Sequence, residues 1–71
     1  MTKAAQELLE QCVAARRSGA DFPTIWQTVL RNHRLVIGPP VQRLVNDAPV
    51  LEVRLITGQR LIYDAQGFSL P

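Results

Sequence analysis

The stretch VQRLVNDAPVLEVRLITGQRLIYDA, residues 41–65, decides the fold, because it divides into short segments in which apolar and polar residues alternate. A period of two is typical of strands that bury one face. With a hairpin tip at Asp47 and Ala48, Arg43 lies opposite Glu52. A slip by one residue would place Leu44 opposite Glu52 or Arg43 opposite Leu51, and would exchange the two faces. We therefore expect this charge-matched register.

A second hairpin, around residues 58–60, sets Arg54 opposite Asp64 by the same reasoning. Each opposed ion pair is worth only about 0.2 to 1 kcal/mol, so the pairs select a register more than they stabilise the domain. The sequence predicts a three-stranded antiparallel meander with strands at about 41–45, 50–56 and 61–65.

The two faces of this meander differ in composition. The face expected to pack on the helices carries Leu44, Leu51, Val53, Leu55, Leu61, Tyr63 and Ala65. Five branched apolar residues lie on the outer face among charged side chains, namely Val41, Val45, Val50, Ile56 and Ile62. Strand propensity alone would also place valine and isoleucine there. The alternative interpretation is an interface, because a monomer seldom exposes such a patch, and it predicts a homodimer or a protein partner.

Two amphipathic helices are expected before the sheet. The first spans about 2–18, with Thr2 as its N-cap and Gly19 as its terminator. The second spans about 22–33, where apolar residues recur at helical spacing after the N-cap residue Asp21. The link between them is so short that the helices must be neighbours. The predicted fold class is α+β, with both helices packed on one face of the meander.

The segment from Pro40 to Asn46 permits a second interpretation, because Pro40 also suits the first turn of a short third helix. Three helices followed by a hairpin resemble a winged helix in layout, which implies a nucleic-acid-binding domain. A strand is preferred, because the matched charges follow from it and the helix would have barely two turns. We expect residues 38–40, Gly-Pro-Pro, to interrupt regular structure. The residues expected to contact nucleic acid in this alternative are Arg31, Arg34, Gln42, Arg43, Arg54 and Arg60, although solvated or paired arginines would fit the same positions.

Length, composition and net charge limit the functions that the chain can have. The chain has 71 residues, 46% of them apolar, and a net charge of +2. A chain near this length forms one domain and buries only about 60% of the surface of its unfolded form, so association with a second chain would bury more. The charge excess is too small to indicate a nucleic-acid binder by itself.

The sequence offers little to a catalytic site. Cys12 and His33 are the only residues of their types, which excludes an internal disulfide and a two-histidine metal site. A dyad of the two would lack an orienting third group. No signal peptide, membrane span or glycine-rich phosphate loop is recognisable. We expect a cytoplasmic non-enzymatic interaction module with no cofactor, no metal and no identifiable small-molecule substrate, self-associating through the outer sheet face.

Overall fold

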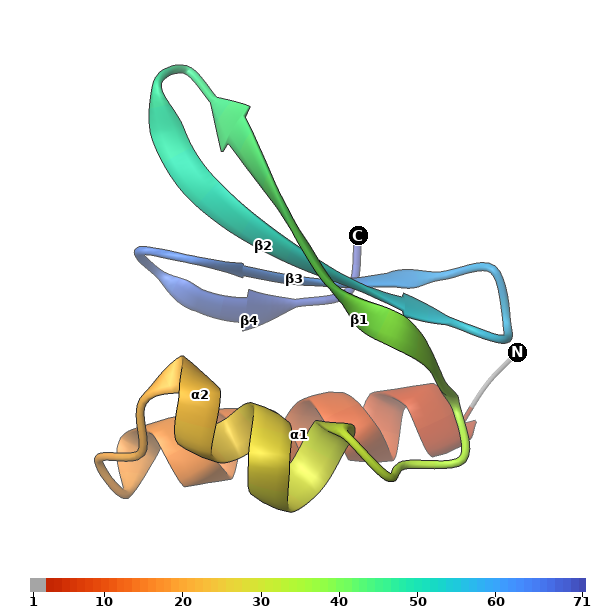
Figure 1. Cartoon of the computed structure of the whole chain (residues 1–71). Coiled ribbons are helices and arrows are strands. Elements are labelled where there is room, and N and C mark those ends of the chain that lie inside the picture. The colour runs from red at the N-terminus through yellow and green to blue at the C-terminus, as the bar shows by residue number, and fades with distance from the viewer. Residues whose placement is uncertain (1–2) are drawn as a thin grey trace.

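A computed structural model describes residues 3–71 and confirms an α+β fold, in which the helices cover one face of an antiparallel sheet (Figure 1). The sheet has four strands in the order β1-β2-β3-β4, one more than predicted. The elements are α1 (Lys3–Arg17), α2 (Phe22–Ile25), η1 (Trp26–Leu30), β1 (Val36–Val45), β2 (Ala48–Leu55), β3 (Arg60–Asp64) and β4 (Gly67–Ser69).

Helix α1 matches its predicted span closely. The predicted cap Thr2 lies outside the described residues. At the other end Gly19 adopts φ 97°, the left-handed conformation that glycine tolerates best, and the helix stops there. Ala5, Leu8 and Cys12 form its buried stripe, at the three- and four-residue spacing of one helix face.

The second helical segment is shorter than the predicted 22–33. Asp21 caps it as expected, since its carboxylate accepts the Thr24 N–H at 3.0 Å, and hydrogen bonding to the side chain and then the backbone of Thr24 lowers the pKa of Asp21. The helix widens into the π-helical turn η1 and ends there. Leu35 explains the early end: its side chain is buried in the core and its carbonyl accepts the Ile56 N–H at 2.8 Å. The chain must leave the helix to reach both partners.

The first hairpin turns at Asn46 and Asp47, and not at Asp47 and Ala48 as predicted. Both residues have positive φ, 52° and 65°, and Val45 pairs directly with Ala48. A two-residue turn with left-handed backbone matches the twist of the flanking strands better than a wider tip does. The predicted register is therefore wrong by two residues.

An even shift keeps every side chain on its predicted face, because side chains alternate with a period of two. Val41 now pairs with Glu52, and Arg43 pairs with Val50. The ion pair survives as a diagonal contact, with Arg43 Nε 3.2 Å from Glu52 Oε1. Residues 40–45 belong to strand β1 and not to a third helix, so the winged-helix alternative is wrong.

The second hairpin is shifted by four residues. Arg54 pairs with Arg60 and not with Asp64, and the Leu55 N–H donates to the Gln59 carbonyl at 3.0 Å. The resulting loop of three residues is tighter than the predicted one, and Gly58 supplies its left-handed position with φ 91°. Opposed arginines repel, but Arg60 Nη1 lies 3.9 Å from Glu52 Oε1, which offsets part of the repulsion.

Strand β1 begins at Val36, five residues before the predicted start. Residues 38–40 were expected to interrupt regular structure, but they lie within the strand. They interrupt its pairing instead, because these three residues stand where β2 has Val53 alone. Gly38 adopts φ 67° in this bulge, and the two prolines are tolerated because β1 is an edge strand.

The C-terminal tail forms β4 beside β3 and supplies the fourth strand. Ala65 lies in the turn between them and is exposed, so it does not face the helices as predicted. Between the sheet and the helices the rings of Phe22, Tyr63 and Phe68 pack with centroids 4.7 to 6.1 Å apart. The fully buried residues of the core are Ala5, Leu8, Cys12, Phe22, Ile25, Leu30, Leu35, Val53, Leu55 and Leu61.

Truncating a side chain should lower the free energy of unfolding much more on the helix-facing side of the sheet than on its outer face. Leu61 is 1% exposed, so Leu61→Ala should lower the free energy of unfolding by about 2 to 5 kcal/mol. Ile37 is 49% exposed on the outer face, and Ile37→Ala should cost about 1 kcal/mol or less. Urea unfolding of both variants measures the difference, and equal losses would contradict this assignment of faces.

Candidate interaction surface

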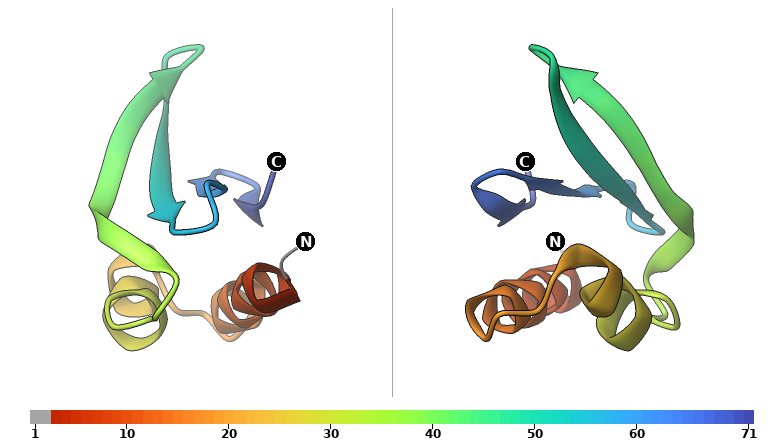
Figure 2. Two further views of the ribbon diagram at one scale, coloured as in Figure 1. Left: turned by 90° about the vertical axis from the view of Figure 1, so that its right-hand side faces the viewer. Right: turned by 60° about the vertical axis from the view of Figure 1, so that its left-hand side comes forward.

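The β1–β2 hairpin extends beyond the rest of the sheet and away from both helices (Figure 2). We call residues 42–49 the arm. Every residue of the arm is exposed. Leu44 shows this most clearly, because it was predicted to face the helices and is 70% exposed. A two-stranded hairpin without a covering layer is marginal in water, so the arm lacks the support that the rest of the sheet receives.

Pro49 marks the point where the arm leaves the sheet. The Leu55 N–H points toward β3, so by strand alternation the nitrogen of Pro49 points to the same side and has no hydrogen to donate. Pairing with β3 ends at Leu51, opposite Tyr63. The chain turns soon after Tyr63, and β2 continues alone with β1.

The other edge of the arm also has no pairing strand among residues 3–71. Since the backbone groups of Val50 point toward β1, those of its partner Arg43 point back toward β2. The backbone N–H and C=O groups of Gln42 and Leu44 therefore point outward from the edge of the sheet. Exposed edges of this kind pair readily with another chain.

A cavity of about 650 Å³ lies between the arm, the β3–β4 turn and the end of α1, and we call it the notch. Figure 1 shows how the arm and the β3–β4 hairpin diverge on its two sides. At its polar rim Arg16 Nη2 donates to the Ala65 carbonyl at 3.4 Å, and Asp64 Oδ1 accepts the Gln66 N–H at 2.9 Å. Most of the lining is apolar and comes from Val45, Ala48, Pro49, Val50, Leu51 and Tyr63.

The five predicted interface residues do not form one continuous patch. Val45 is 51% exposed on the arm, whereas Val50 is buried. Val41 and Ile62 are half-buried and lie on either side of Glu52. Ile56 is exposed, but it lies in the β2–β3 turn, at the opposite end of β2 from the arm. Of the four exposed large apolar residues described within 3–71, Leu44 and Val45 lie on the arm and Leu44 is the most exposed, whereas Ile37 and Ile56 lie outside it.

Leu44 was missed because the predicted tip was one residue too late. With the turn at Asn46 and Asp47, β2 starts earlier and Leu44 pairs with Pro49, beyond the last residue that β3 reaches. The signal was present in the sequence, because asparagine and aspartate are the residues that tolerate left-handed backbone.

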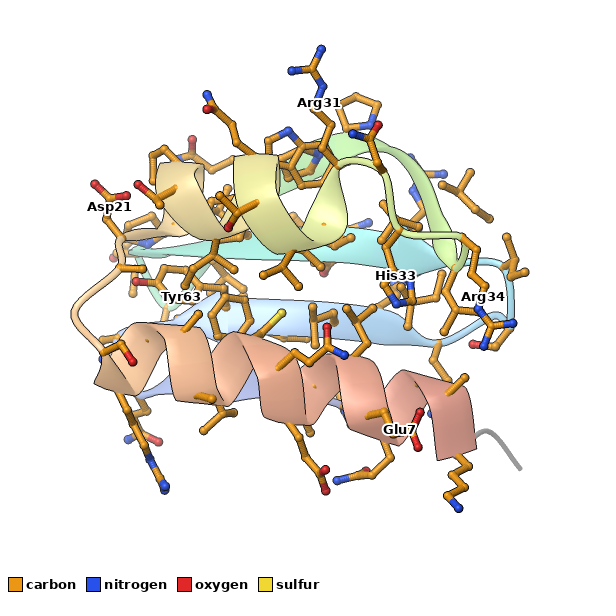
Figure 3. All side chains as sticks on the ribbon, turned by 90° about the horizontal axis from the view of Figure 1, so that it is seen from below. Glu7, Asp21, Arg31, His33, Arg34 and Tyr63 are labelled. Carbon is orange, nitrogen blue, oxygen red and sulfur yellow. The ribbon has the colours of Figure 1, made fainter. Side chains whose placement is uncertain are left out.

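The arginines predicted to contact nucleic acid are divided between two sides of the molecule. Arg43, Arg54 and Arg60 share the outer face, where Glu52 contacts the first and the last of them. Arg31 and Arg34 follow η1, and in Figure 3 their side chains point in different directions. Gln42 lines the notch. The structure brings together three of the six residues.

Cys12 and His33, the pair considered above as a dyad, each have surroundings typical of a structural residue. Cys12 is buried in the core, and burial raises the pKa of its thiol to about 11. His33 Nδ1 accepts the Leu35 N–H at 3.1 Å. Within residues 3–71, no group of three His, Cys, Asp or Glu side chains is placed to hold a metal ion. In the same range no helix has the length and apolarity needed to cross a bilayer.

Comparisons with protein-family models, curated proteins and solved structures give no significant match to this chain.

The raised pKa of Cys12 predicts a particular pH dependence. The folded protein keeps this proton up to about pH 11, whereas the unfolded thiol loses it near pH 8.5 to 9. Stability is therefore fully present below pH 8.5 and falls between about 9 and 11, by at most about 1.4 kcal/mol per pH unit. Urea unfolding from pH 7 to 10.5 measures this fall, and Cys12→Ala should reduce it.

Proposed function

We propose that this chain is a small non-enzymatic interaction module that self-associates through the arm and the adjoining outer face of the sheet. The observation that carries the proposal is the arm itself, which has exposed faces, unpaired edges and no covering layer. An exposed edge with apolar side chains is a liability unless another chain covers it.

The total surface supports this proposal. The chain exposes 4897 Å², whereas a compact monomer of its 7.9 kDa is expected to expose about 4,400 Å². The excess of about 500 Å² is more than half of the roughly 800 Å² that each partner contributes to a standard interface. Association through the arm would remove this excess from water.

A second copy is favoured over an unrelated partner, because the chain carries both an exposed apolar projection and an apolar notch beside it. Closed twofold symmetry is the commonest arrangement of soluble oligomers, and it uses one self-complementary surface twice. A small domain also gains stability when its marginal core is extended by a partner.

Self-association should depend on the arm. Sedimentation velocity at micromolar concentration should show a dimer, and Leu44→Asp should weaken it at least tenfold, because a carboxylate would be desolvated in the interface. Gln27→Asp on the exposed side of η1 is the matched control and should leave the dimer intact. A monomer at 100 μM wild-type protein would refute the proposal.

The competing function is binding to nucleic-acid phosphates through Arg43, Arg54 and Arg60, which share the outer face. Arg54 favours it, because no ion pair to Arg54 is found among residues 3–71. If self-association is the function, fluorescence anisotropy at 20 mM salt should detect no binding to single- or double-stranded DNA. A binding affinity whose logarithm falls with log salt at a slope of about 2 to 3 would favour nucleic acid instead. Arg54→Gln should then reduce this slope by about one.

A further inference from the structure

We infer that the two copies interlock, the arm of each copy entering the notch of the other, with Leu44 as the inserted apolar side chain and Asp47 facing Arg16. This arrangement rests on the proposed self-association and specifies its contacts.

The apolar parts of the two surfaces are complementary. Leu44 is 70% exposed and lies outside the lining of its own notch, so its side chain is available to another copy. The notch has about 650 Å³ of space, bounded by Val45, Pro49 and Tyr63 among others. Insertion would remove from water the most exposed of the large apolar side chains described for residues 3–71 and would fill a mainly apolar cavity.

The charges are complementary too. Arg16 stands at the rim of the notch and Asp47 at the tip of the arm. Among the described residues neither belongs to an ion pair. Arg16 uses one nitrogen in a long bond to the Ala65 carbonyl, which leaves further guanidinium donors for a carboxylate. Asp64, the acidic residue of the same notch, accepts the Gln66 N–H and remains a negative charge, whereas Arg16 is the cation in the lining with which an entering carboxylate can pair.

The connectivity makes the contact reciprocal. Because the arm forms one wall of the notch, a second arm that enters the notch necessarily packs against the first arm. With twofold symmetry the first arm lies in the notch of the second copy in the same way. One contact surface is used twice, which closes the assembly at two copies.

A mixing experiment tests the pairing of Arg16 with Asp47. Arg16→Glu alone and Asp47→Lys alone each place like charges at both contacts of a homodimer. Each variant should therefore dimerise about tenfold more weakly than the wild type, since two exposed ion pairs are each worth several-fold in affinity. In an equimolar mixture both contacts become complementary, Asp47 with Arg16 in one and Lys with Glu in the other. Sedimentation velocity with one variant fluorescently labelled should show a heterodimer of nearly wild-type affinity.

The neutral variants Arg16→Gln and Asp47→Asn are the matched control, and mixing them should restore much less affinity. Recovery on mixing would also show that both charged variants are folded, and circular dichroism checks each one alone. If the single variants dimerise as tightly as the wild type, or if mixing folded variants restores no affinity, the interlocked arrangement is overturned. The wild-type dimer then forms through another surface. A wild-type monomer would overturn the arrangement and the proposed function together.

Discussion

The left-handed backbone at Asn46 and Asp47 determines the geometry of the whole β1–β2 hairpin, because the turn fixes which residues of the two strands are opposite. Residues other than glycine enter this region at a cost, and asparagine and aspartate do so most readily. The pair therefore sets the register of an eight-residue arm, and with it the exposure of Leu44 and the depth of the notch.

The faces of the sheet could be predicted from the sequence, but its register could not. Alternation assigned Val53, Leu55 and Leu61 to the core and Arg43 and Glu52 to the outer face, and all five lie where expected. The register was chosen from opposed ion pairs worth at most about 1 kcal/mol each, which is too little to outweigh the geometry of a turn. Both errors were even numbers of residues, since an odd shift would have moved apolar side chains into water.

The candidate surface was predicted only in part, because it depends on where neighbouring strands end. Alternation indicated that valine and isoleucine lie on the outer face, but it could not show that β3 turns back after Asp64 and leaves the first residues of β2 unpaired on that side. The bulge at residues 38–40 adds to this, because the extra residues of β1 let the hairpin bend away from the helices. The sequence indicated an interruption at Gly38 and the two prolines after it. In the structure these residues form the bulge that precedes the arm.

Stability and association are coupled in a chain of this size. Among residues 3–71 ten buried residues form the core cluster, whereas every residue of the arm is exposed. Any partner that binds only the folded state raises its stability in proportion to the logarithm of the partner concentration. If that partner is a second copy, the unfolding midpoint of the protein rises with its own concentration. The arm is then the element through which folding of one copy favours folding of the next, because its turn is formed locally while its faces and edges are covered only in the assembly.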